Sequence, residues 1–101
     1  MKAAILRSAA RDDVRQAFDY YRGAADEDTA RGFVQALREA GKLIGRYPAL
    51  GSARYAELLG IAGLRCLALR RYPYLVFYFE RADHIDVWRV LHAAADIPAW
   101  L

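Results

Sequence analysis

The apolar residues of this chain change their spacing after Pro48. Before that proline they recur at steps of four, three, four and three residues, which is the period of one face of an α-helix. The residues of this stripe are Phe33, Leu37, Ala40, Ile44 and Tyr47. After Gly63 come three short runs rich in leucine, β-branched and aromatic residues, at 64–71, 74–80 and 84–92, which predict strands. Helical and strand patterns in separate halves are typical of an α+β domain.

The first part of the chain adds a strand and another helix. Residues 2–7 form a short apolar segment that we expect to be a strand. Ser8 predicts a helix N-cap, with Asp12 and Asp13 in the first turn, where the helix dipole favours acids. Apolar residues at helical spacing carry this helix to about Gly23.

The second helix has a clear start and end. The acidic run 26–28 supplies a cap and dipole support at its start. Pro48 ends it, because the residue before a proline is pushed out of helical conformation. Residues 52–63 show no regular pattern and carry no assignment.

These elements predict the order β-α-α-β-β-β in a single domain of residues 1–101. Two amphipathic helices joined by a short polar link form an antiparallel hairpin. Short connections around Tyr72-Pro73 and 81–83 make neighbouring strands antiparallel. We therefore expect the N-terminal strand and the helix hairpin to pack on one face of a mainly antiparallel sheet.

Two sets of side chains alternate along the run 74–80. The wholly apolar set consists of Leu75, Phe77 and Phe79. The more amphipathic set consists of Tyr74, Val76, Tyr78 and Glu80. Because amphipathic side chains suit a face in contact with solvent, we assign the second set to the open, binding face of the sheet.

Composition excludes several protein classes. With 101 residues, 56% hydrophobic, the chain can bury one core without disulfides. No apolar run approaches the roughly 20 residues of a membrane helix, and Arg7 interrupts the only segment that resembles a secretory signal. The single cysteine, Cys66, excludes an internal disulfide and a Cys-built metal site, and its place on a strand indicates a core residue. We expect a cytoplasmic protein without metal or cofactor.

The basic residues are unusual in kind, because 13 of the 15 are arginine. The net charge of +3 is too modest to indicate nucleic-acid binding by itself. The arginines at 11, 15 and 22 fit a solvated helix face. A second group lies on or beside the predicted strands, where no acid occurs between Glu57 and Glu80: Arg65, Arg70, Arg71 and Arg89. Such a cationic surface suits bidentate contacts with carboxylates.

Five sequence motifs occur in order along the chain. They are RSAARDDV at 7–14 with Tyr20-Tyr21, Tyr47-Pro48-x-x-Gly51, Gly63-Leu64-Arg65, RYPYLVFY at 71–78, and IDVWRVLH at 85–92. Together they resemble the ParE branch of the ParE/RelE superfamily of bacterial type II toxins. The resemblance covers nearly the whole chain, and it agrees with the order of elements reached above.

This resemblance implies a toxin that is neutralised by an antitoxin from an adjacent gene, in a hetero-oligomeric complex. ParE-like members poison DNA gyrase, and RelE-like members cut mRNA in the ribosome. For antitoxin binding we expect Arg65, Arg70, Arg71, Tyr74 and Tyr78. For target binding, with gyrase as the target, we expect the C-terminal segment with His92 and Trp100.

Two alternatives remain open. A metal-independent endoribonuclease would use His92 as acid or base, with Arg65, Arg70 and Arg89 on the phosphate and Glu57 or Glu80 as a further base. The chain has no lysine beyond Lys42 and no tyrosine after Tyr78, and its tail is apolar, so we favour gyrase binding without bond cleavage. His92 also has a structural interpretation, with Asp96 as its partner. The other alternative is a non-toxic member of the family that binds only its antitoxin.

Overall fold

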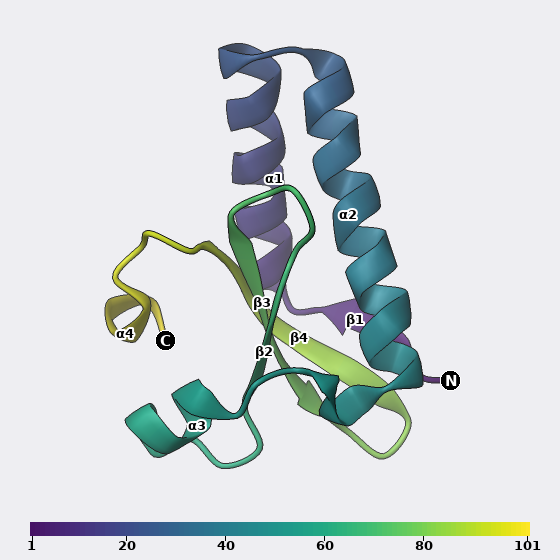
Figure 1. Cartoon of the computed structure of the whole chain (residues 1–101), viewed down its shortest axis with the longest axis vertical. Helices are drawn as coiled ribbons and strands as arrows, with labels where there is room; N and C mark the ends of the chain where they lie inside the picture. Colours follow the sequence, from purple (N-terminus) through teal and green to yellow (C-terminus); the bar gives the residue numbers. More distant parts are fainter.

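The computed structural model describes residues 1–101 and contains one four-stranded sheet, two long helices and three short helical segments (Figure 1). In chain order the elements are β1 (Ala3–Leu6), α1 (Ser8–Ala24), α2 (Glu27–Arg46), the 3-10 turn η1 (Pro48–Leu50), α3 (Arg54–Leu59), β2 (Arg65–Ala68), β3 (Tyr74–Glu80), β4 (His84–His92) and α4 (Ile97–Trp100). The predicted α+β order is confirmed. No helix combines the length and the apolar character that a membrane crossing requires.

The sheet has the strand order β1-β4-β3-β2. β3 pairs antiparallel with both of its neighbours, whereas β1 runs parallel to β4, with Ala3 opposite His84 and Leu6 opposite Val87. The parallel pair follows from the intervening helices, because a strand reached by a crossover connection can align parallel. The sheet is therefore mainly antiparallel, as expected, with β1 and β2 at its edges.

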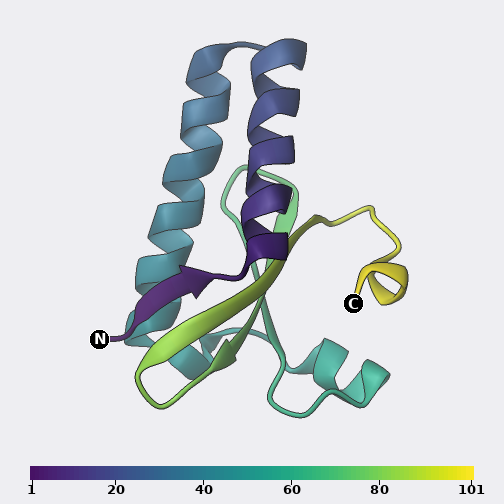
Figure 2. The ribbon, with the colours of Figure 1, turned by 180° about the vertical axis from the view of Figure 1, so that it is seen from behind.

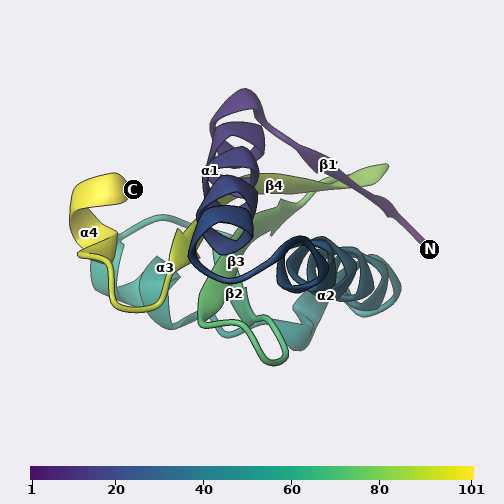
Figure 3. The same ribbon diagram turned by 90° about the horizontal axis from the view of Figure 1, so that it is seen from above.

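The helices α1 and α2 form an antiparallel hairpin on one face of the sheet, and their connecting turn extends beyond it (Figures 1 and 2). Seen from above, α3 and α4 lie on the opposite side of the molecule from α2 (Figure 3). The C-terminal segment thus lies nearer to α1 than to α2.

The start of α1 differs from the prediction. Its N-cap is Arg7, and no side chain caps the first turn, so Ser8 is the first helical residue. The backbone N–H of Arg7 donates to the Val87 carbonyl at 2.9 Å, which keeps residue 7 extended beside the sheet. Asp12 and Asp13 fall beyond the first turn; Asp12 pairs with Arg15 instead of capping the helix.

The start and end of α2 follow the sequence. The Asp26 side chain caps it by accepting a hydrogen bond of 2.7 Å from the Thr29 backbone N–H. Hydrogen bonding from Thr29 holds the pKa of Asp26 below its usual value. The helix ends at Arg46, just before the residue that precedes Pro48.

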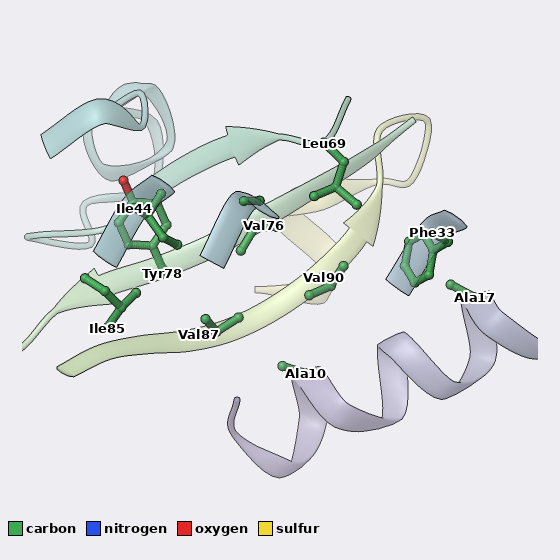
Figure 4. Packing of buried hydrophobic residues seen from close by; sticks show 11 residues of the cluster. Ala10, Ala17, Phe33, Ile44, Leu69, Val76, Tyr78, Ile85, Val87 and Val90 are labelled. Atoms are coloured by element: carbon green, nitrogen blue, oxygen red, sulfur yellow. The ribbon is translucent and has the colours of Figure 1, made fainter. Parts of the chain in front are cut away.

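The main core lies between the helix hairpin and the sheet (Figure 4). Its buried residues are Ala10, Ala17, Phe33, Ala40, Ile44, Leu69, Val76, Tyr78, Ile85, Val87 and Val90. Val76 and Tyr78 therefore point to the helices, with Tyr74 packed at the margin, so our assignment of this set to the open face is wrong. Tyr78 can lie on this face because its hydroxyl, although fully buried, is hydrogen-bonded to the Pro48 carbonyl.

The other face of the sheet is largely covered too. A second core cluster consists of Leu64, Cys66, Phe77, Leu91 and Ile97, with Tyr55 and Ile61 packed against it. The short helix α3, unassigned in the sequence, and the C-terminal segment supply this cover. Leu75, Phe77 and Phe79 are wholly apolar because they face this second core.

The predicted strand 64–71 is shorter than expected. β2 ends at Ala68, and Leu69 turns into the main core. Arg71 has φ 69°, the only positive φ outside glycine, so the chain reverses in a tight turn before β3. The arginines at 70 and 71 consequently stand on this turn and not on the sheet.

Candidate functional site

Four of the predicted site residues line one pocket: Tyr74, Arg89, His92 and Trp100. The pocket, which we call the C-terminal pocket, has a volume of about 410 Å³ and lies between α1, the ends of β3 and β4 and the C-terminal segment. Its other lining residues are Asp13, Gln16, Ala17, Tyr20, Val90, Leu91 and Ala95. Residues that the sequence placed in three separate roles thus share one site.

An ion pair between Arg89 and Asp13 lines the C-terminal pocket. Arg89 Nε and Nη2 donate to the two carboxylate oxygens at 2.7 Å each, and the Val90 backbone N–H donates to Oδ2 at 3.0 Å. The two side chains are only 16% and 8% exposed. The hydrogen bond with Asp13 raises the pKa of Arg89 above its ordinary value, so the guanidinium is a permanent cation. This pair fastens α1 to β4.

Arg89 also holds the C-terminal segment. Its Nη1 donates to the Trp100 carbonyl at 3.0 Å, and its guanidinium carbon lies 5.7 Å from the centre of the Trp100 ring. Ile97 is buried in the second core, whereas the Trp100 side chain is 56% exposed. Arg89 therefore holds Trp100 in place, and the rest of the indole surface faces the pocket and solvent.

His92 is fixed by its own chain. Its Nδ1 accepts a hydrogen bond of 3.0 Å from the Ala94 backbone N–H, and its ring meets Tyr74 edge-on at 5.2 Å. The structural partner that we predicted, Asp96, is wrong, because the tight turn after β4 brings the Ala94 amide to the ring first. Acceptance at Nδ1 places the proton of the neutral imidazole on Nε2, which stays available as a donor.

Two predicted binding residues are structural. The hydroxyl of the fully buried Tyr78 donates to the Pro48 carbonyl at 2.8 Å and accepts from the Gly51 N–H at 2.9 Å. Arg65 donates to the carbonyls of Ala49 at 3.2 Å and Gly51 at 2.8 Å. Both side chains brace the turn after α2. The assignment of Tyr78 to an antitoxin-binding surface is wrong, because its side chain does not reach the surface.

Arg70 and Arg71 occupy a separate place. They line a hollow of about 270 Å³ between the β2–β3 turn and α2, beside Gln35 and Glu39. Arg65 is hydrogen-bonded to the carbonyls of Ala49 and Gly51, and Arg89 forms an ion pair with Asp13. The four residues of the nuclease alternative therefore occupy three locations and do not converge on one phosphate.

The remaining reactive side chains are apart from one another. Glu57 is exposed on α3, and Glu80 pairs with Lys2 at 2.8 Å. Cys66 is buried, as predicted, and burial raises the pKa of its thiol to about 11. No three His, Cys, Asp or Glu side chains lie close enough together to hold a metal ion.

A second candidate surface runs along the outer side of the helix hairpin. Three adjoining hollows share lining residues there: Leu6 joins the first to the second, and Phe18 with Val34 joins the second to the third. Their volumes are about 510, 390 and 470 Å³. We call this continuous surface the hairpin groove. Its apolar floor consists of Ala4, Leu6, Val14, Phe18, Val34 and Leu37.

The charged residues that line the hairpin groove are all basic. They are Lys2, Arg11, Arg15, Arg31, Arg38 and Lys42. Lys2, Arg15 and Arg31 have acidic partners within the chain. Arg11, Arg38 and Lys42 make no ion pair. In the sequence, the spacing of Arg11 and Arg15 puts both on one side of a helix, which by itself indicates only a solvated face.

Comparisons with known proteins agree on one family. The family model described as the ParE toxin of the type II toxin–antitoxin system parDE matches residues 4–97. Among solved structures, a chain of the chromosomal ParDE toxin–antitoxin system from P. aeruginosa superposes with a TM-score of 0.74 at 23% identity, covering 91% of this chain and 96% of that one, and so shares the fold. No curated protein gives a match. Because the family model spans nearly the whole chain, the protein belongs to the ParE toxin family of type II toxin–antitoxin systems.

Proposed function

We propose that this toxin is neutralised by an acidic antitoxin segment seated in the hairpin groove, and that it acts on DNA gyrase by binding without bond cleavage. Membership of the toxin family supports a toxin with an antitoxin partner. The similar chain from P. aeruginosa belongs to a ParDE toxin–antitoxin system, which supports the same pairing for this protein.

The observation that carries the antitoxin site is the charge of the hairpin groove: six basic lining residues surround an apolar floor, and no acidic residue lines it. An amphipathic segment with apolar anchors on one side and carboxylates on its flanks matches this surface. Such a segment folds as it binds, because its apolar side has no core to enter beforehand.

The arginines proposed from the sequence for this contact are less suited to it. Arg65 is engaged by backbone carbonyls, and Arg70 and Arg71 lie at the β2–β3 turn. Arg70 and Arg71 remain candidates for a peripheral contact, since they make no ion pair within the chain. Arg11 and Arg38, which line the hairpin groove, are therefore the proposed central contacts for the antitoxin carboxylates.

The test is charge reversal in the groove. The double variant Arg11→Glu/Arg38→Glu should weaken affinity for the product of the adjacent gene by at least about tenfold, since lost ion pairs are replaced by repulsion. Arg54→Glu on α3 is the control, because it alters charge far from the groove. An antitoxin affinity equally reduced by both variants, or by neither, contradicts the proposed site.

The proposal for the target rests on the C-terminal pocket. His92 and Trp100 are both exposed there, and Arg89 holds the indole in place. The nuclease constellation does not assemble, which supports action by binding. Brief expression of the toxin alone in a bacterial host separates the outcomes: DNA breaks support gyrase poisoning, rapid mRNA loss with intact DNA supports a nuclease, and normal growth supports a non-toxic binder.

A further inference from the structure

We propose that the C-terminal pocket is a nucleotide site, which takes a nucleobase against its aromatic walls and the attached phosphate at Arg89 and His92. This inference goes beyond the proposed function, because it assigns a chemical class of ligand to a pocket whether or not gyrase is the target. The ligand is a free nucleotide or one nucleotide of an unpaired strand.

Four of the eleven residues that line the pocket carry aromatic rings. Tyr20 from α1, Tyr74 from β3, His92 from β4 and Trp100 from α4 contribute four rings to one pocket. Two of them are well exposed, Tyr20 at 63% and Trp100 at 56%, although both belong to the largest side chains. Exposed rings that surround a hollow are a stacking surface for a planar group, and a nucleobase offers such a π-face whatever its sequence.

The polar groups of the pocket are mainly donors. The Arg89 guanidinium has five N–H groups and uses three, one each on Nε, Nη1 and Nη2, in the contacts given above, so two remain. His92 keeps its Nε2 proton, because Nδ1 is occupied by Ala94. The only carboxylate, that of Asp13, already accepts three hydrogen bonds and is 8% exposed. An acceptor-rich, anionic group fits this set, and a phosphate supplies it.

Further hydrogen-bonding groups at the rim have no partner within the chain. The hydroxyls of Tyr20 and Tyr74 and the amide of Gln16 take part in none of the side-chain hydrogen bonds of the fold. Amide and hydroxyl groups can both donate and accept, which matches the mixed edge of a base. The volume of about 410 Å³ falls in the range of roughly 300–1,000 Å³ that small-molecule sites occupy.

The pocket provides its own reporter, because Trp100 is one of two tryptophans and Trp88 is the other. In Trp88→Phe, the fluorescence of Trp100 alone is followed while thymidine 5′-monophosphate is added. We expect saturable quenching, and weaker binding of thymidine alone and of inorganic phosphate alone. A short oligothymidylate distinguishes the two sources: tighter binding than the mononucleotide indicates a strand, and weaker binding indicates a free nucleotide.

Variants of exposed residues test the site without disturbing the core. Tyr20→Ala should weaken nucleotide binding by at least about fivefold, the loss expected for one stacking contact. Gln16→Ala provides a second pocket variant. Tyr47→Ala is the matched control, since Tyr47 is a similarly exposed tyrosine, at 55%, outside the pocket. The proposal is overturned by an unquenched Trp100, by equal effects of Tyr20→Ala and Tyr47→Ala, or by saturation with N-acetyl-tryptophan instead of the nucleotide, which would indicate a peptide carboxylate.

Discussion

The Tyr78 hydroxyl and the Gly51 N–H meet at 2.9 Å, and this buried hydrogen bond ties the central strand β3 to the turn that follows the helix hairpin. The same hydroxyl donates to Pro48 at 2.8 Å, so one oxygen holds both ends of the turn. A Cβ on Gly51 would lie within 3 Å of the Tyr78 ring and hydroxyl, which explains glycine in the Tyr-Pro-x-x-Gly motif.

The first prediction concerns this contact. Tyr78→Phe should lower the free energy of unfolding by about 1–3 kcal/mol, because the Gly51 N–H and the Pro48 carbonyl lose a buried partner. Urea unfolding measures it, with Tyr47→Phe as an exposed control expected to be neutral. Equal stability of the two variants would mean that water replaces the hydroxyl.

A second prediction uses two helical glycines in contrasting surroundings. A Cβ on Gly45 of α2 would overlap the Lys2 carbonyl of the adjoining N-terminal backbone, and nothing lies within 4 Å of a Cβ on Gly23 of α1. Gly45→Ala should therefore destabilise the fold by about 1–3 kcal/mol. Gly23→Ala should stabilise it by about 0.5–1 kcal/mol through helix propensity. Thermal unfolding of both variants checks the opposite signs; a shared sign would contradict the close approach at Gly45.

The third prediction concerns the ion pair of the C-terminal pocket. Arg89→Leu leaves the Asp13 carboxylate buried with one backbone donor, so unfolding should become easier by about 3 kcal/mol. The double variant Asp13→Asn/Arg89→Leu should recover part of this loss, because no uncompensated charge remains. A double-mutant cycle in urea measures the coupling. Additive effects of the two substitutions would show that the pair contributes no coupling energy.

The fourth prediction concerns acid. The hydrogen bond from Arg7, joined by that from Arg81, lowers the pKa of Asp86 to about 2. A carboxylate with a lowered folded-state pKa adds stability above its unfolded pKa, near 4, and loses it as pH falls toward 2. Wild type should lose of the order of 2 kcal/mol across this window from Asp86 alone.

Asp86→Asn is the variant that tests this assignment. It should be less stable at pH 7 and should show a smaller fall between pH 4 and pH 2. Asp19→Asn removes an exposed carboxylate on α1 and is the control for the loss of one negative charge. Parallel acid profiles of wild type and Asp86→Asn would refute the contribution of this carboxylate.

The bounds of β3 and β4 could be predicted from sequence to the residue, because turn residues flank dense runs of aromatic and β-branched side chains. The sequence does not indicate which face of β3 contacts the helices, because both faces of the strand are covered. The alternation of Leu75 with Val76 indicates only that their side chains lie on opposite faces of the sheet. The six-residue helix α3 is too short for a periodic signal.

The contacts of Arg89 could not be predicted from the sequence for a different reason. Its partner Asp13 lies 76 residues away and looks like an ordinary helix acid. The pairing of Phe77 with Arg89 and of Tyr78 with Val87 leaves Trp88 as an extra residue, so Val87 and Val90 both face the helices. No propensity in the run 84–92 indicates that bulge.

The pairing of β1 with β4 sets an order of events during synthesis. Ala3 pairs with His84, so β1 gains its neighbour in the sheet only after residue 84 has been synthesised. Lys2 and Leu6 line the hairpin groove, so that surface is completed only when most of the chain has left the ribosome. A partner that needs the whole groove, such as the proposed antitoxin segment, therefore meets a finished polypeptide.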